Sequence, residues 1–342
     1  TKIGLSPAIL RTRLRAKEGG ETLLSLREEL RRMLGDASLE VSVLLGTPGV
    51  HQKALLQAVS ADGRILAYAK VGWTTSTAAM IDKEHQALSS QIVRGLSSVE
   101  VPRVLGHRVW GAGRLLVLGP PSGSEWKGGP RRIGPRHFHF LRELFQSTAT
   151  EVAVDERLGE FEDRAEALRG LGLSYDAHLL KWATDTVRLR VGGLRLPHGA
   201  LHGDFAPWNT LSAGDRLFVL DWEYWAPRGT PGWDYFHFVV QTSSLVGGSS
   251  GGQVIRRIEG GARAEGEALL RSLGVPVGLY SALCVLYLID IAGRSLERDP
   301  SLAKADPSRL CQTWRSMLFL AGSGAWAMES TGSKPFSEEP WV

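Results

Sequence analysis

The most informative parts of this sequence are Leu201-His-Gly-Asp-Phe-Ala-Pro-Trp-Asn209 and Leu217-Phe-Val-Leu-Asp-Trp-Glu-Tyr224. Asp204 precedes Asn209 by five residues, and Asp221 directly follows the apolar start of the second stretch. Phosphoryl transfer needs one carboxylate beside the attacking hydroxyl, together with an amide oxygen and a second carboxylate to hold Mg²⁺. Asp204, Asn209 and Asp221 supply these groups, so we predict a phosphoryl-transfer site in this block.

The order and spacing of these residues resemble those of the aminoglycoside phosphotransferase and choline kinase superfamily. The matching features are His202-Gly-Asp204 with Asn five residues after the Asp, and Asp221-Trp-Glu223 about a dozen residues later. Asp221-Trp-Glu-Tyr224 followed by Trp233-Asp-Tyr-Phe-His-Phe238 is similar to the choline and ethanolamine kinase branch in particular. The loop also has the Asp-to-Asn spacing of protein kinases, with Gly203 in place of their arginine.

The resemblance implies an α+β, bilobal, protein-kinase-like fold. Its N-lobe would hold a small antiparallel sheet with one inserted helix, and its C-lobe would be mainly helical. Enzymes of this superfamily transfer the γ-phosphate of ATP to a hydroxyl of a small molecule. By the resemblance, Asp204 is the catalytic base, Asn209 and Asp221 are the Mg²⁺ ligands, and Asp234 holds the catalytic loop in place.

Four further residues of the block are candidates for positioning the loop or contacting the acceptor. They are His202, Trp208, Glu223 and Tyr224. Aromatic faces suit quaternary ammonium groups and sugars, although aromatic residues also serve as core packing. Glu223 fits either a role near the metal or the acceptor, or a structural ion pair.

The sequence before this block predicts a small sheet. Helical spacing covers 78–92, and alternating apolar residues bounded by turns indicate strands over 41–45, 54–59, 64–71, 101–105 and 114–118. Lys70 ends the third strand, and Glu84 follows fourteen residues later in the helix. A kinase-like N-lobe needs a strand lysine for the nucleotide phosphates and a helix glutamate to hold it. We predict that Lys70 and Glu84 form this pair.

The loop between the first two strands reads Gly46-Thr-Pro-Gly-Val-His-Gln-Lys53. Gly46, Thr47 and Gly49 are candidates to cover the nucleotide phosphates with backbone N–H groups. With two glycines and a proline that lacks an N–H, the loop departs from the glycine-rich loop of protein kinases. Lys53 could contact phosphate, but a solvated loop position is the simpler interpretation.

A hinge and three regions complete the predicted organisation. The stretch Gly119-Pro-Pro-Ser-Gly123 follows the last strand, so we expect a hinge there, with Gly119 near the adenine. We expect a helical N-terminal extension over 1–38, a nucleotide-binding N-lobe over 39–122 and a catalytic and acceptor-binding C-lobe over 123–342. Helices of the C-lobe are expected near 136–147, 174–190, 233–246, 253–273, 276–298 and 307–329.

The composition excludes several classes of protein. With 342 residues, 43% hydrophobic and 22% charged, the chain is globular rather than disordered. Its two cysteines, Cys284 and Cys311, exclude a disulfide scaffold and fit buried thiols, so we expect a cytoplasmic protein. The net charge of +4 comes without a basic aromatic motif, so no nucleic-acid partner is expected. The apolar run 276–293 contains Asp290, which favours a buried core helix over a membrane span.

The sequence therefore predicts an ATP- and Mg²⁺-dependent kinase of a small-molecule hydroxyl. Sugars, amino alcohols and aminoglycoside-like acceptors stay open, and residues 251–342 balance ten basic against ten acidic side chains. GTP stays open as a donor, and the oligomeric state is undetermined. The alternative function is a non-catalytic kinase-like module that binds a nucleotide or a partner. A protein kinase is disfavoured, because Trp222-Glu223 stands where Phe-Gly would follow the aspartate.

Overall fold

The computed structural model describes residues 23–45, 52–123, 126–129, 132–303 and 307–326. The chain divides into two compact units: residues 1–147 with 201–227, and residues 148–200 with 228–342. The block 201–227, which holds the predicted catalytic loop, therefore groups with the N-terminal sheet rather than with the helices that flank it in sequence. The expected lobe boundary at residue 122 stays a prediction.

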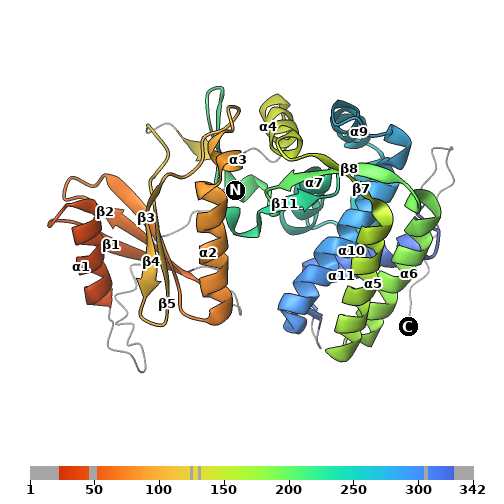
Figure 1. Ribbon diagram of the computed structural model, residues 1–342, viewed down its shortest axis with the longest axis horizontal. Helices are drawn as coiled ribbons and strands as arrows, with labels where there is room; N and C mark the ends of the chain where they lie inside the picture. The colour runs from red at the N-terminus through yellow and green to blue at the C-terminus, as the bar shows by residue number, and fades with distance from the viewer. Residues whose placement is uncertain (1–22, 46–51, 124–125, 130–131, 304–306, 327–342) are drawn as a thin grey trace. The chain divides into compact units, whose positions relative to one another are not determined.

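The first unit is built on a five-stranded antiparallel sheet in the order β1-β2-β3-β5-β4 (Figure 1). The strands are β1 (Glu40–Leu45), β2 (Ala54–Val59), β3 (Ile65–Gly72), β4 (Val104–Trp110) and β5 (Gly113–Leu118). Four of them lie where the alternating pattern predicts strands. The strand expected from residue 101 starts later, at Val104, because Pro102 has no N–H to donate to the ladder.

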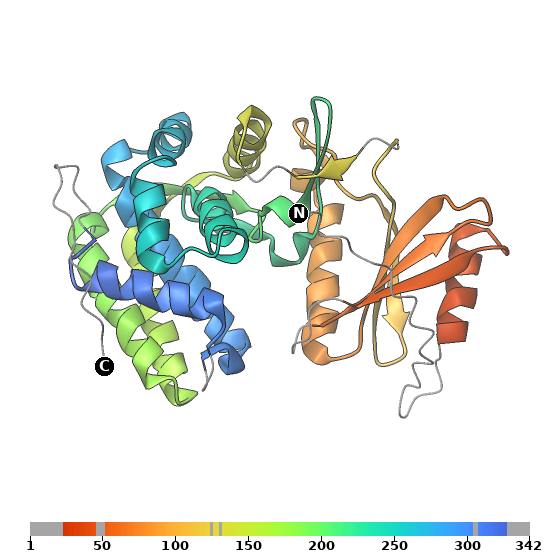
Figure 2. The ribbon, with the colours of Figure 1, turned by 180° about the vertical axis from the view of Figure 1, so that it is seen from behind.

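Helices cover both faces of this sheet. On one face, Leu26 and Leu30 of α1 (Leu23–Leu34) pack against apolar side chains of β2, β3 and β5, so this part of the expected extension belongs to the core. On the other face lies α2 (Thr75–Ser89), as Figures 1 and 2 show. The helix expected over 78–92 divides at Ser90, whose side chain caps the short α3 (Gln91–Arg94).

The remaining elements of the first unit carry the motif residues. α4 (Pro135–Gln146) precedes the motifs in the chain, close to its predicted range. A second sheet has the order β10-β9-β6, with β6 (Lys127–Gly128), β9 (Thr210–Ala213) and β10 (Arg216–Val219). The 3₁₀ turn Pro207–Asn209 lies directly before β9. A second 3₁₀ turn, Trp222–Tyr224, follows β10 after Leu220 and Asp221.

The second unit is mainly helical. α5 (Val154–Gly170), α6 (Ser174–Val191), α10 (Tyr280–Arg298) and α11 (Arg309–Gly322) pack together, as both views show. The other helices are α7 (Trp233–Gln241) with a π-helical turn over Thr242–Val246, α8 (Gly251–Glu259) and α9 (Arg263–Ser272). A small sheet, lying mostly in this unit, has the order β11-β8-β7, with β7 (Thr150–Ala153), β8 (Arg195–Leu201) and β11 (Ala226–Gly229).

Two parts of the second unit differ from the sequence prediction. α5 was not predicted, although Val154, Leu158 and Phe161 form a buried stripe at helical spacing among many charged residues. The single helix expected over 253–273 is two helices, α8 and α9. The pair Gly260-Gly261 separates them, because glycine is a poor helix former.

α10 forms the centre of the second unit's core. Among the described residues, the segment Val277–Arg298 is long and apolar enough to cross a membrane, but 72% of its apolar window is buried within the protein. Asp290 in this helix accepts hydrogen bonds on Oδ1 from Arg294, Arg157 and Arg164 at 2.9, 3.0 and 3.1 Å. The expected core helix is confirmed, and both cysteines of the sequence are buried free thiols.

Candidate active site

The loop after β8 carries the His-Gly-Asp motif, and its geometry requires glycine at position 203. Gly203 has a left-handed backbone, with φ of +81°. A Cβ at this position would lie 2.2 Å from the backbone oxygen of Tyr224, so a larger residue would displace the chain. The two motif stretches thus come into direct backbone contact beside Asp204.

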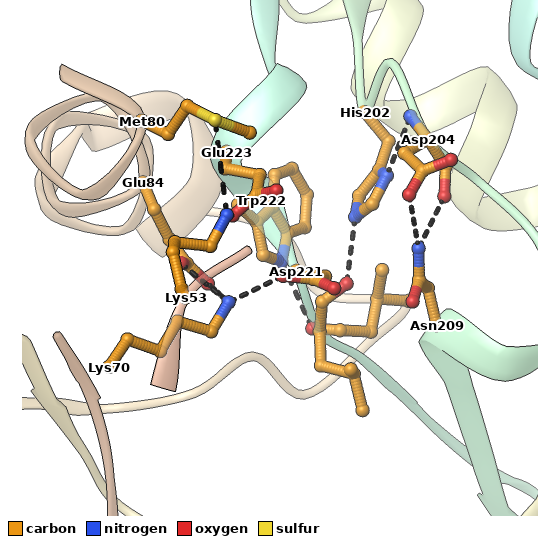
Figure 3. A network of polar contacts seen from close by, with 12 residues as sticks. Lys53, Lys70, Met80, Glu84, His202, Asp204, Asn209, Asp221, Trp222 and Glu223 are labelled. Carbon is orange, nitrogen blue, oxygen red and sulfur yellow. Dashed lines mark hydrogen bonds and ion pairs between the residues drawn. The ribbon is translucent and has the colours of Figure 1, made fainter. Parts of the chain in front are cut away.

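Asn209 holds the carboxylate of Asp204 (Figure 3). Its Nδ2 donates hydrogen bonds to the backbone oxygen and to Oδ2 of Asp204, each at 2.8 Å. The 3₁₀ turn Pro207–Asn209 brings the amide back to Asp204, which explains why the spacing of five residues matters. The amide oxygen of Asn209 points away from Asp204 and can face another ligand.

His202 joins the two motif stretches from the interior. Its Nε2 lies 3.1 Å from the backbone oxygen of Leu220, and its Nδ1 accepts a hydrogen bond from the Asp204 N–H at 3.3 Å. Because a carbonyl oxygen only accepts, Nε2 is the donor in the first contact, and Nδ1 is the acceptor in the second. The buried ring meets Trp222 edge to face, with centroids 4.7 Å apart. This geometry supports loop positioning rather than acceptor contact for His202.

Asp221 has a left-handed backbone, with φ of +72° and ψ of +56°. Among the non-glycine residues that the structure describes, it alone has a positive φ. Such a conformation costs about 1 kcal/mol or more, although aspartate tolerates it better than most residues. Trp222 anchors the turn, since its buried indole donates Nε1–H to the Val219 oxygen at 3.0 Å. The turn brings the Asp221 carboxylate to Lys70 (Figure 3).

Lys70 pairs with two carboxylates. Its Nζ lies 2.8 and 2.6 Å from the two oxygens of Glu84 and also donates to Asp221. Glu84 is fully buried on α2, and the Lys70 side chain is 13% exposed. The structure therefore brings Lys70 and Glu84 together as the sequence predicts, and their role toward a nucleotide stays a prediction.

The charges of this cluster stabilise one another. Burial disfavours the charged form of Lys70, but the carboxylates of Asp221 and Glu84 outweigh burial and raise the pKa of Lys70. Burial likewise acts to raise the pKa of Asp221, and the Lys70 ammonium outweighs it, so the pKa of Asp221 is lowered. Burial raises the pKa of Glu84, against the effect of Lys70. Asp221 is therefore ionised at neutral pH and suited to a cation.

A second lysine–carboxylate pair lies beside the first. Lys53, directly before β2, donates from Nζ to Glu223, and the same Nζ lies 4.0 Å from the sulfur of Met80 (Figure 3). The side chains of Lys53 and Glu223 are only 13% and 8% exposed. The solvated position expected for Lys53 is therefore wrong, because the charge of Glu223 holds the ammonium in the interior. Local sequence carries no signal of this pair, whose members are 170 residues apart.

Three carboxylates gather where the two pairs meet. Glu84, Asp221 and Glu223 each place an oxygen within 4.8 Å of the others, an arrangement that could hold a cation. Burial and the neighbouring Asp221 carboxylate raise the pKa of Glu223, which shows how crowded the negative charge is. Oxygen ligands of this kind are the ones that Mg²⁺ takes in proteins.

The other predicted residues of the first unit have different surroundings. Trp208 is 44% exposed, so its ring is accessible to a ligand. Tyr224 contributes its backbone oxygen to the close approach at Gly203. The N–H of Gly119 donates to the Arg103 oxygen at 2.8 Å, so this backbone donor is used within the protein. Acceptor contact by Trp208 and nucleotide contact by Gly119 stay predictions.

Four predicted residues lie outside the described part of the first unit. Gly46, Thr47 and Gly49 lie outside the described residues. Asp234 belongs to the second unit, where it is buried in the first turn of α7. Its expected hold on the catalytic loop stays a prediction.

Solved structures share the fold of this chain. No protein-family model matches the chain, and no curated protein matches its sequence. A thermostable mutant of aminoglycoside phosphotransferase APH(4)-Ia, in ternary complex with ADP and hygromycin B, matches with a TM-score of 0.56. The match covers 88% of this chain and 99% of that chain, at 11% sequence identity.

A second solved structure also matches over most of both chains at low sequence identity. The GDP complex of an aminoglycoside 2'-phosphotransferase-IIIa mutant matches with a TM-score of 0.57. It covers 89% of this chain and 98% of that chain, at 12% identity. This chain has the kinase-like fold of the aminoglycoside phosphotransferases. The predicted fold is confirmed, and at this level of identity the likeness extends to the fold alone.

Proposed function

We propose that this protein is an ATP- and Mg²⁺-dependent phosphotransferase that moves the γ-phosphate to a hydroxyl of a small molecule. The observation that carries the proposal is one constellation in the first unit. Asp204 is held by Asn209, and Asp221 is paired with Lys70, which Glu84 holds in turn. These are the groups that phosphoryl transfer requires, on a fold shared with known phosphotransferases.

Asp204 would orient the acceptor hydroxyl and accept its proton. Asn209 donates to one oxygen of this carboxylate and so fixes its orientation in the loop. Positioned groups of this kind contribute roughly 10²–10⁴-fold to the rate. The loop backbone around Gly203 and His202 would keep this carboxylate in place.

Asp221 and Asn209 would hold Mg²⁺. The residues present fit the ion, because an ionised carboxylate and an amide oxygen are hard oxygen ligands, with Glu223 close by. When bound, Mg²⁺ would neutralise the charge of the phosphate oxygens. Lys70 would meet the α- and β-phosphates, with Glu84 setting its position.

The donor and acceptor are proposed by class. The neighbouring structures contain ADP or GDP, so ATP is proposed with GTP as the alternative donor. Hygromycin B is named in one of those complexes. For this chain, the exposed ring of Trp208 in the catalytic loop supports an acceptor with a sugar or cationic face, such as a sugar, an amino alcohol or an aminoglycoside-like compound.

The test combines nucleotide binding with ADP release. Saturating Mg·ATP should raise the midpoint of thermal unfolding by a few degrees, and a chelator should reduce this shift. ADP release should then appear with one acceptor of a panel of sugars, amino alcohols and aminoglycosides. Binding without any product across the panel would favour the non-catalytic module instead.

Two matched substitutions separate the roles of the aspartates. Asp204→Asn should lower turnover by at least ~10²-fold and leave Mg·ATP affinity nearly unchanged, because this carboxylate acts on the acceptor. Asp221→Asn should instead weaken the magnesium-dependent part of ATP binding, measured by calorimetry. Full turnover by Asp204→Asn, or equal nucleotide affinities for the two variants, would contradict these roles.

A further inference from the structure

We propose that Lys53 is a second lysine for the nucleotide phosphates, held at the site by Glu223 and released from it when Mg·ATP binds. The inference rests on the proposed kinase function. It goes beyond that function by assigning a role to a residue that stands outside both motif stretches.

Lys53 and Lys70 belong to the same face of the sheet. β2 pairs with β3 so that Leu55 lies opposite Lys70, and Lys53 lies two residues before Leu55. Side chains alternate along a strand and match across an antiparallel pair, so these three residues share a face. The opposite face is filled by apolar side chains packed on α1. The sheet thus presents two ammonium groups to the carboxylate cluster (Figure 3).

The catalytic loop itself brings no positive charge. Between Asp204 and Asn209 the chain reads Phe-Ala-Pro-Trp, without Lys or Arg. Phosphoryl transfer depends on cations that neutralise charge on the transferred group. In this chain that charge must come from elsewhere, and Lys53, directly before β2, and Lys70 of β3 both act on the Asp221 carboxylate.

The pair with Glu223 is suited to exchange. A buried ion pair gains little net free energy, because desolvation of both charges offsets their attraction. A phosphate would give Lys53 a negatively charged partner, like Glu223, but with a higher charge. Glu223 would then be left beside Asp221, at the oxygen cluster proposed for Mg²⁺. Both charged groups therefore keep a partner before and after nucleotide binding.

A fixed structural ion pair makes a different prediction, and calorimetry with ATP, ADP and AMP separates the two. Lys53→Met should weaken Mg·ATP binding by ~10-fold or more and AMP binding by less than about twofold, because the lost contact is to the terminal phosphates. A structural pair would lower the affinity for all three nucleotides alike. Lys181→Met is the control, since that lysine is 53% exposed and pairs with Asp185 on the surface of the second unit. Its nucleotide affinities should match the wild type.

Glu223→Gln should change the affinity for ATP in the opposite direction from Lys53→Met. In the presence of a chelator, this variant should bind metal-free ATP about threefold or more tightly than the wild type, because Glu223 no longer competes with phosphate for Lys53. The double variant Lys53→Met/Glu223→Gln should lose that gain. Unchanged or weaker binding by Glu223→Gln would overturn the exchange. This measurement stays decisive even if Lys53→Met fails to fold, because Lys53 is retained.

The outcomes distinguish this inference from the proposed function. A wild-type protein that binds neither Mg·ATP nor Mg·GTP would overturn both. A wild type that binds ATP and releases ADP, with equal losses for ATP and AMP in Lys53→Met, would overturn the role of Lys53 alone.

Discussion

Asp204 is held from three directions by residues close to it in sequence. Asn209 donates to its carboxylate, His202 accepts from its N–H, and Gly203 allows the turn that precedes it. Each contact is short-range, so the His-Gly-Asp motif and the following Asn already describe the loop. Positioning of this kind matters because a displacement of about 1 Å at a reacting group can cost about 10²-fold in rate.

We predict that Gly203→Ala destabilises the protein and lowers turnover. The left-handed backbone costs an alanine about 1 kcal/mol or more, and the contact of its Cβ with the Tyr224 oxygen adds to this cost. We expect the free energy of unfolding to fall by at least about 2 kcal/mol, measured by urea denaturation.

Gly214→Ala is the matched control for this prediction. Gly214 also has a positive φ, of +56°, but a Cβ there would meet no atom within 4 Å. Gly214→Ala should lower the free energy of unfolding by about 1 kcal/mol, because only the left-handed backbone disfavours alanine there. Equal losses for the two variants would show that the approach to Tyr224 is not tight.

At the scale of elements, one carboxylate ties α4 to the segment that follows α3. Glu143 on α4 accepts hydrogen bonds from the N–H and hydroxyl of Ser97 at 2.7 and 2.6 Å, and from the N–H of Ser98 at 2.9 Å. The Ser98 hydroxyl also donates to it. Burial acts to raise the pKa of Glu143, but these hydrogen bonds outweigh burial and lower the pKa to about 2.

We predict that this contact stabilises the protein in a pH-dependent way. The folded pKa lies below the ordinary value of 4.5, so the stabilisation is fully present above about pH 4.5 and is lost as the pH falls toward about 2. Glu143→Ala should lower the free energy of unfolding at pH 7 by about 1–2 kcal/mol, the low end for a partly exposed charged group. The difference from the wild type should shrink on acidification. A difference that stays constant from pH 7 to pH 3 would contradict the assignment.

At the scale of the whole molecule, each compact unit has its own core. In the first unit α1 and the sheet bury their apolar faces against each other, and in the second unit the helices surround α10. Asp290 lies inside that second core with 1% exposure, bound by three arginines and by the indole Nε1–H of Trp233 at 2.9 Å. The buried charge is therefore a structural centre of the second unit.

We predict that Asp290→Ala lowers the free energy of unfolding by about 3–5 kcal/mol. Removing this carboxylate leaves the guanidinium groups of Arg157, Arg164 and Arg294 near one another without their shared partner. Asp185→Ala is the control, because its pair with Lys181 is about half exposed on both sides and should contribute no more than about 1 kcal/mol. Similar losses for the two variants in urea denaturation would contradict this role.

Much of the fold could be predicted because its signals are local. The alternation of apolar residues marks the strands around Lys70, and helical spacing marks most helices of the second unit. Errors arose where a local signal was weak or misleading. Pro102 shifted the start of β4, Gly260-Gly261 divided one expected helix, and the many charges of α5 obscured its apolar stripe.

Local sequence patterns are enough to identify the chemical groups that the protein carries and the order in which they occur. Asp204 and Asn209 are predicted from their spacing within one loop, and Asp221 from its place at the end of an apolar strand, because both signals are local in the sequence. Which distant charges come into contact depends instead on how the whole chain packs. Lys70 and Asp221 are 151 residues apart, and Lys53 and Glu223 are 170 apart. Buried charges of opposite sign pair wherever the packing brings them together, and no local pattern encodes that meeting.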